Sequence, residues 1–311
     1  MIWETSNNHR EIFRKNWEDK IMKRLALLLA AMGIVSAAAF AEAPVLKVTS
    51  VGQEIEIENS DGGADVDSIF FANSVGLSYG DWSFGVTGGK FWSYDGDDGL
   101  DSTNSRLQID VWKKVTDDLK LGYRYRGQKN YDRHYVRWDY SNNWFWSSGD
   151  VWYESNNGTV GATDNINSEF FPVGVKFGDL KLGYFVNYKN NVGDIAAGQD
   201  ESYIEHQLRA YYPLYTGEKF ALNFEGRFWL ASDYDYKDNT NGTTPAYRHL
   251  EAGTMRLYLK PSYKVSDSLT VYGYYGYEFK DWKYENGAER ATYHAENDNY
   301  QDIGFGWTYT F

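Results

Sequence analysis

The sequence predicts an all-β protein, a transmembrane antiparallel up-and-down β-barrel of about 12 strands. Three observations predict this fold: a secretory leader, a recurring apolar–polar alternation after it, and an aromatic last strand that ends at Phe311. Successive side chains of a strand point to opposite faces, so alternation gives each strand one apolar and one polar face. A membrane barrel needs both faces, because lipid contacts the outer one and a polar lumen the inner one.

The composition agrees with this fold class. The chain has 27 Tyr and 30 Gly but only 5 Pro, which favours strands over helices. Its mean hydropathy of −0.62 resembles that of a soluble protein, but half of each barrel strand is polar and dilutes the apolar signal. The net charge of −13 argues against nucleic-acid partners. Since the chain has no cysteine, its stability must come from strand pairing and packing.

The first segment expected along the chain is a secretory signal peptide at residues 22–41. The apolar run from Leu25 to Ala41 follows Met22-Lys23-Arg24 and ends in an A-x-A sequence, the pattern of a cleaved leader. We expect cleavage after Ala41, which leaves residues 42–311 as the barrel domain. We interpret the hydrophilic residues 1–21 as a start-site artefact, with translation beginning at Met22. The alternative is a retained membrane anchor, for which the run is short.

Twelve alternating segments follow the leader, and each is expected to be a strand. For example, Ile303, Phe305, Trp307 and Tyr309 alternate with small or polar residues in the last segment. The expected strands are 45–58, 67–79, 82–94, 104–115, 119–131, 167–177, 180–191, 202–215, 220–234, 249–265, 269–284 and 298–311.

The connections between these segments are alternately short and long. The short ones contain turn-forming residues: Gly80-Asp81, Thr116-Asp117-Asp118, Gly178-Asp179, Thr216 to Lys219 and Ser266-Asp267-Ser268. The long ones, rich in Asp, Asn and Gly, lie at 59–66, 95–103, 132–166, 192–201, 235–248 and 285–297. Short periplasmic turns and long external loops are typical of outer-membrane barrels, and an even strand number brings both ends of the barrel to the periplasmic side.

The 132–166 connection is the weakest part of this assignment. It holds four of the twelve tryptophans, and a further hairpin hidden in it would raise the strand number to 14. If it is a loop, it would either narrow the barrel mouth or present an adhesive surface, since exposed aromatic clusters mark binding sites. The soluble alternative to the barrel is a periplasmic sandwich or meander. Membrane-interface girdles favour the barrel; their expected members are Tyr79, Trp82, Tyr123, Tyr125, Tyr188, Tyr212 and Tyr263.

Strand parity assigns charged side chains to the lumen, because a Lys or Arg on the lipid face at mid-depth costs about 2–4 kcal/mol. The expected pore-lining residues are Arg106, Asp110, Lys120, Arg124, Arg126, Lys181, Lys189, Arg209, Glu225, Arg227, Arg256, Lys260, Glu278 and Lys280. The same parity turns Glu54, Glu56, Glu58 and Asp302 inward. Basic residues outnumber acidic ones in this set, although the whole protein is acidic.

Two interpretations of this basic lumen remain open. In one, the basic side chains line a water-filled pore and attract anionic or sugar-like solutes, with Arg124, Arg126, Arg209, Arg227 and Arg256 at the constriction. In the other, they pair with acidic neighbours and fill a narrow barrel. Eight strands are filled by side chains and sixteen to eighteen leave a channel, so about twelve strands lie between these limits.

No enzymatic, metal or cofactor site is expected. The five histidines show no metal-ligand spacing, and the nucleophile–base pairing that acyl transfer needs is not visible. The acidic segment 95–101 lacks the closing carboxylate of an EF-hand, so we interpret it as a solvated loop, with divalent bridging to lipopolysaccharide as the alternative.

The repeated strands Leu119-Lys-Leu-Gly-Tyr-Arg-Tyr and Leu180-Lys-Leu-Gly-Tyr-Phe-Val, together with the leader and the terminal Phe, resemble those of Gram-negative outer-membrane porins. The segment from Leu257 to Leu269 is similar in style to FomA-like major outer-membrane porins, and the strand number and basic lumen to twelve-stranded acidic-oligosaccharide porins. The resemblance implies a passive diffusion channel in the bacterial outer membrane for small hydrophilic solutes, with a mild anion or acidic-sugar preference. Its implied partners are outer-membrane lipid and lipopolysaccharide, with a homotrimer as the candidate assembly. The alternative function is a surface adhesin or structural barrel without an open pore.

Overall fold

The computed structural model describes residues 44–59, 65–97, 99–158, 163–193, 195, 199–237, 247–251, 253–286, 289–294 and 299–311. The signal peptide and the hydrophilic leader expected at 1–41 lie outside these residues. Residues from Leu46 to Phe311 form one compact unit. No helix that could cross a membrane occurs in the described part of the chain.

Every regular element of this unit is a β-strand, and all neighbouring strands are antiparallel. The strands are β1 Lys47–Asn59, β2 Val66–Tyr79, β3 Trp82–Asp95, β4 Gly99–Lys114, β5 Leu119–Gln128, β6 Tyr131–Ser141, β7 Phe145–Asn156, β8 Asp164–Phe177, β9 Leu180–Val192, β10 Asp200–Thr216, β11 Phe220–Tyr236, β12 Tyr247–Glu251, β13 Met255–Lys264, β14 Leu269–Phe279, β15 Asp281–Asn286, β16 Glu289–His294 and β17 Gln301–Thr310.

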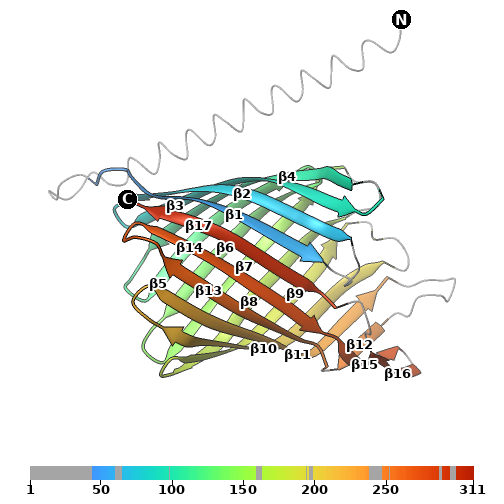
Figure 1. Ribbon diagram of the computed structural model, residues 1–311. Helices are drawn as coiled ribbons and strands as arrows, with labels where there is room; N and C mark the ends of the chain where they lie inside the picture. The colour runs from blue at the N-terminus through green and yellow to red at the C-terminus, as the bar shows by residue number, and fades with distance from the viewer. Residues whose placement is uncertain are drawn as a thin grey trace, which may run out of the picture. The chain divides into compact units, whose positions relative to one another are not determined.

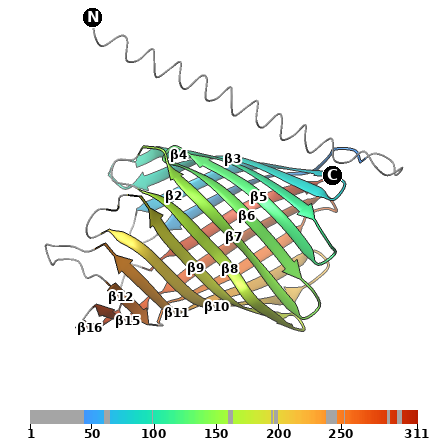
Figure 2. The ribbon, with the colours of Figure 1, turned by 180° about the vertical axis from the view of Figure 1, so that it is seen from behind.

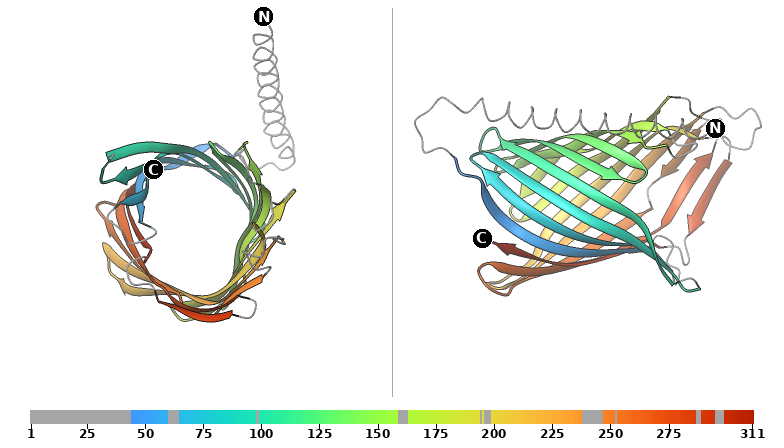
Figure 3. Two further views of the ribbon diagram at one scale, coloured as in Figure 1. Left: turned by 90° about the vertical axis from the view of Figure 1, so that its right-hand side faces the viewer. Right: turned by 90° about the horizontal axis from the view of Figure 1, so that it is seen from above.

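Fourteen of these strands close into a barrel, seen end-on as a ring in Figure 3. Strands β1 to β11 follow one another around the wall, β13 and β14 continue it, and β17 pairs with both β14 and β1. The closing β1–β17 ladder runs from Ser50 opposite Thr310 to Asn59 opposite Gln301. The barrel prediction is confirmed, with the alternative of 14 strands in place of 12.

The two additional wall strands come from the 132–166 segment, whose assignment as a long loop was wrong. It folds into the β6–β7 hairpin, whose turn is stabilised by Asn142. The side-chain oxygen of Asn142 accepts hydrogen bonds from the backbone N–H groups of Trp144 and Phe145, at 3.1 and 2.8 Å. The connection between β5 and β6 consists of only Lys129 and Asn130, so this loop-end connection is as short as the turns at the other end.

Three short strands extend the wall at its loop end. Strand β12 pairs with the C-terminal part of β11 and with β15, and β15 pairs with β16. The expected single strands 249–265 and 269–284 are therefore each divided, and the expected loop 285–297 contains most of the β15–β16 hairpin. Figures 1 and 2 show these strands at the end of the barrel opposite to the start of β1 and the end of β17.

The tight turns lie at the same end of the barrel as the start of β1 and the end of β17 (Figure 1). Gly80 and Gly178 adopt φ angles of 55° and 59° in two of these turns, a region that glycine enters without a steric penalty. In the turn after β4, Lys114 Nζ lies 2.7 Å from Asp117 Oδ1. This hydrogen bond and charge pairing lower the pKa of the exposed Asp117 carboxyl.

Burial in the barrel is the inverse of that in a soluble sheet. In β17 the apolar Ile303 and Phe305 are 44% and 60% exposed, whereas Asp302, which points to the other side of the same strand, is only 6% exposed. Other large apolar side chains exposed on the same outer face include Leu107, Leu121, Val136, Leu208 and Leu259. A water-facing surface of this kind would be costly, so lipid is the solvent that this face requires.

Candidate functional site

The inner face of the barrel is identified by side chains that meet although their strands do not pair. The rings of Trp146 on β7 and Tyr211 on β10 are 6.2 Å apart, with two strands between them. The Arg137 guanidinium on β6 lies 4.6 Å from the Trp112 ring on β4. Such convergence occurs only on the concave side of a closed wall.

The residues that sequence parity assigned to the lumen lie on this face, by contact or by strand parity. They are Arg106 and Asp110 on β4; Lys120, Arg124 and Arg126 on β5; Lys181 and Lys189 on β9; Arg209 on β10; Glu225 and Arg227 on β11; Arg256 and Lys260 on β13; Glu278 on β14; and Lys280 directly after it.

A first network of ion pairs is centred on Asp110. Its Oδ1 atom lies 2.6 Å from Nε of Arg124 and 2.7 Å from Nη1 of Arg137. Arg137 also pairs through Nε with Asp150, at 2.5 Å. Each of these four side chains is between 15% and 23% exposed. One carboxylate thus holds two arginines side by side on neighbouring strands.

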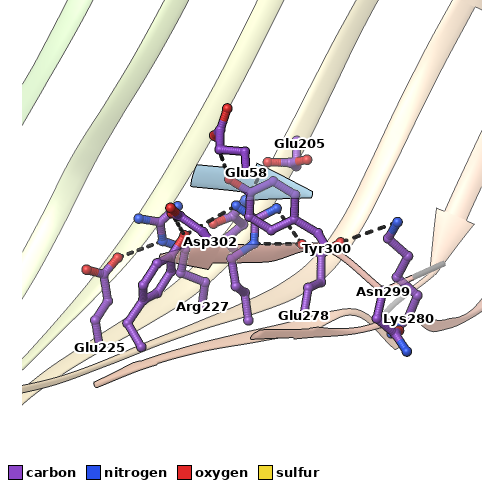
Figure 4. A network of polar contacts seen from close by, with 12 residues as sticks. Glu58, Glu205, Glu225, Arg227, Glu278, Lys280, Asn299, Tyr300 and Asp302 are labelled. Atoms are coloured by element: carbon purple, nitrogen blue, oxygen red, sulfur yellow. Dashed lines mark hydrogen bonds and ion pairs between the residues drawn. The ribbon is translucent and has the colours of Figure 1, made fainter. Parts of the chain in front are cut away.

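A second network extends from β11 to β17, and Figure 4 shows it from close by. Glu225 pairs with Nε of Arg227 at 2.6 Å and with Nζ of Lys260 at 2.5 Å. Glu278 pairs with Nη2 of Arg256 at 2.6 Å. Arg209, Arg227 and Arg256 are register neighbours on β10, β11 and β13. The inner face therefore carries a row of three guanidinium groups.

Several inner cations have no ion pair in the described residues. Arg209 donates through Nε to Gln207 Oε1 at 2.7 Å, and its guanidinium lies 3.4 Å from the Phe185 ring centroid. Arg126 donates through Nε to Gln108. Arg106 stacks over two phenylalanine rings. Neither Arg106 nor Lys120, Lys181 or Lys189 forms an ion pair within the described part of the chain.

Many inner charged groups keep contact with solvent. The Lys260 side chain is 40% exposed even though it pairs with Glu225, and Glu169, on the inner face of β8, is also exposed. Other large inner side chains are buried, among them Tyr135, Phe185 and Tyr258 at 3–4% exposed. The inner face is thus packed in part, while charged groups such as Lys260 and Glu169 on it stay accessible.

Inner aromatic rings lie flat against glycines of the neighbouring strand. A Cβ atom at Gly122 would come within 2.6 Å of the Trp112 ring, and one at Gly276 within 2.4 Å of the Tyr258 ring. Rings that lie along the wall do not project toward the barrel axis. The glycines thus allow bulky side chains on the inner face without filling the lumen.

The same arrangement closes the barrel where β17 meets β1. Tyr272 and Tyr274 on β14 cross over Gly306 and Gly304 of β17. Their hydroxyls donate to glutamates of β1, the first to Glu54 at 2.9 Å and the second to Glu56 at 3.1 Å. Tyr300 OH donates to Glu58 at 2.6 Å. Three tyrosine–glutamate hydrogen bonds therefore span the closing ladder.

No protein-family model and no curated protein sequence matches the chain. Among solved structures, a bacterial polysaccharide outer membrane secretin is 9% identical with a TM-score of 0.50, covering 85% of this chain and 98% of that chain. This chain has the fold of a transmembrane β-barrel.

Two further solved structures show weaker similarity. OmpT, an outer membrane protein of Vibrio cholerae, is 14% identical, with a TM-score of 0.41 and coverage of 87% of this chain and 100% of that chain. An anion-selective porin from Comamonas acidovorans is also 14% identical, with a TM-score of 0.40 and coverage of 86% and 100%. At these identities the likeness concerns fold alone.

The β6–β7 hairpin contributes inner residues that the sequence analysis missed. Besides Arg137 and Asp150, Arg133 forms an ion pair with Glu154 on the inner face. The odd-numbered residues from Tyr131 to Asp139 point inward, and this alternation, together with the turn-forming Asn142-Asn143, was the signal available in the sequence. Within the described residues, no group of three His, Cys, Asp or Glu side chains could hold a metal ion.

Proposed function

We propose that the protein is an outer-membrane porin, a passive diffusion channel for small hydrophilic solutes. The observation that carries this proposal is a closed wall of fourteen strands with an apolar outer face and charged inner side chains that keep contact with water. Barrel diameter grows with strand number, and fourteen strands are closer to the channel-forming range than twelve. Inner rings that lie flat on glycines support an open lumen.

The proposed solute preference is mild and favours anions or acidic sugars. The row of Arg209, Arg227 and Arg256 supplies the positive potential that would attract them, together with Arg126, which forms no ion pair within the described part of the chain. The excess of inner positive charge is smaller than the sequence suggested. The structure adds the acidic Asp150, Glu154, Glu169 and Glu205 to the inner face, against the basic Arg133 and Arg137. We therefore propose a bias in permeability, with neutral solutes also passing.

The apolar outer face leads us to propose outer-membrane lipid and lipopolysaccharide as partners, with a homotrimer as the assembly. The chain is proposed to act without an enzymatic reaction. A second candidate function is a surface adhesin or structural barrel without an open pore. The strands β12, β15 and β16 that extend beyond the wall favour it, because they enlarge the surface at the loop end.

Liposome swelling distinguishes these two functions. Proteoliposomes that contain the folded protein are expected to swell in isotonic sugars at rates that fall steeply from a pentose to a trisaccharide. Such size dependence is the behaviour of a water-filled lumen of fixed width. Liposomes without protein serve as the control. Proteoliposomes that stay impermeable to the pentose would contradict the porin and support the closed barrel.

A further inference from the structure

The inner face of β1 carries three carboxylates that have no cationic partner among the residues that the structure describes. Glu54, Glu56 and Glu58 accept hydrogen bonds only from tyrosine hydroxyls, and none of them contacts a Lys or Arg among the described residues. Elsewhere on the inner face, Asp110, Glu225 and Glu278 each hold a basic side chain. The β1 glutamates, half-buried and facing the lumen, therefore retain their capacity to bind a cationic group.

Asp302 adds an oxygen without a partner to this acidic strip. It stands directly opposite Glu58 in the β1–β17 ladder and is only 6% exposed. Its Oδ2 atom accepts from Tyr258 OH at 3.1 Å, whereas Oδ1 has no hydrogen-bond partner in the described residues. Like charges directly opposite each other on a sheet destabilise it, and a buried acceptor without a donor adds to that cost. A cationic group of a solute bound beside Glu58 would relieve the repulsion between the two carboxylates.

A cation that has no ion pair in the described residues lies a short distance around the wall from this strip. The Arg106 guanidinium on β4 lies 4.5 Å from the Phe70 ring centroid and 4.7 Å from that of Phe91. These two rings stack on each other at 4.3 Å, and Phe70 is the register partner of Glu56. Arg106 also lies within electrostatic range of Glu56. Glu56 and Arg106 thus flank one stacked aromatic pair.

The chemistry of these two unpaired groups selects the class of solute. A small anion would engage Arg106 and be repelled by the glutamates, and a simple cation would experience the reverse. A metal ion is disfavoured, because no three carboxylates in the described residues stand close enough to bind one. A solute with an ammonium and a carboxylate group can engage both sides at once, and charge-assisted hydrogen bonds are the strong ones.

We propose that the inner wall formed by β1 to β4 is a subsite for zwitterionic solutes such as amino acids and short peptides. The solute ammonium binds at Glu56 and Glu58, and its carboxylate binds at Arg106. Phe70 and Phe91 fix the guanidinium along the wall, so that it meets the carboxylate without side-chain rearrangement. This inference rests on the proposed channel function and names a solute class for the same lumen.

Single-channel recording in planar bilayers with the purified protein tests the subsite. Glycylglycine, a zwitterion, is expected to reduce the open-channel current at concentrations where a pentose of similar size does not. Glu56→Gln combined with Glu58→Gln, and separately Arg106→Gln, should each raise the half-blocking concentration of glycylglycine about tenfold, the loss expected for one charge-assisted contact. Asp179→Asn, which removes an exposed carboxylate from the β8–β9 turn, is the matched control and should leave block unchanged.

The outcomes separate this inference from the channel proposal. Wild-type channels that conduct, but that glycylglycine blocks no better than the pentose does, would overturn the subsite alone. The same holds if the glutamine variants conduct and are blocked as strongly as wild type. The absence of any conductance from folded wild-type protein would overturn the channel, and the subsite with it.

Discussion

In the Gly304→Val variant, most molecules are expected to fail to form a stable barrel. A Cβ atom at residue 304 would lie 2.0 Å from Cε1 of Tyr274, which crosses β17 at this point. The ring must move away and loses its hydrogen bond to Glu56. Overpacking and the lost hydrogen bond together cost about 2–4 kcal/mol. The folded fraction, measured as the species whose gel mobility changes on boiling in detergent, should fall sharply.

Two matched variants test the cause of this loss. Gly88→Val changes the same residue type in β3, where no atom lies within 4 Å of the added Cβ, and should fold as well as wild type. Adding Tyr274→Ala to Gly304→Val removes the ring that the valine meets, so part of the folded fraction should return. Normal folding of Gly304→Val alone would show that the tyrosine ring does not need the glycine.

Reversing the charge of two unpaired arginines should invert the ion preference of the channel. Arg126 and Arg209 form no ion pair in the described residues, so Arg126→Glu with Arg209→Glu alters the lumen potential without separating an existing pair. The anion-to-cation permeability ratio should fall about tenfold, since local charge sets the barrier for each ion. The reversal potential in a salt gradient, which measures this ratio, should therefore change sign. Arg227 is less suitable, because its replacement by Glu would leave Glu225 beside a second carboxylate.

The control for this reversal is Lys219→Glu, which reverses one positive charge in an exposed turn outside the lumen. It should alter the reversal potential little, because at about 0.1 M salt the field of an exposed charge is largely screened beyond about 10 Å. An unchanged ion preference in the Arg126→Glu and Arg209→Glu double variant would show that these arginines lie outside the ion path. The anion preference would then have to be abandoned.

The sequence predicted the faces of the strands better than it predicted their number. In β17 the alternation of Ile303 and Phe305 with glycines identified outer and inner sides, because lipid and lumen impose opposite polarity on neighbouring residues. The β6–β7 hairpin was predicted only as the alternative, because its four tryptophans and many polar residues resemble a loop. Its period of two, from Tyr131 to Asp139, was present but had no long run of aliphatic residues to support it.

The contacts of the inner side chains could not be derived from parity alone. Parity turned Asp110 and Arg124 inward, but their pairing depends on the β4–β5 register. Arg137 joins them from a strand that was predicted only as part of the 14-strand alternative. The glycines of β17 appeared in the sequence only as small residues. Their function depends on Tyr272 and Tyr274, which are distant in sequence and become neighbours only through the β14–β17 pairing.

The central claim is that lipid contacts one face of the wall and water the other, and cysteine accessibility tests it most directly. The chain has no native cysteine, so Leu259→Cys and Lys260→Cys would each carry a single thiol. Leu259 and Lys260 are adjacent in β13, so they lie at similar depth and point to opposite faces of the wall. Both are accessible, since Leu259 is 46% exposed and the Lys260 side chain 40% exposed. In proteoliposomes a charged, membrane-impermeant thiol reagent should modify Lys260→Cys rapidly and leave Leu259→Cys unmodified. Equal labelling of both residues, or labelling of Leu259→Cys alone, would contradict the account.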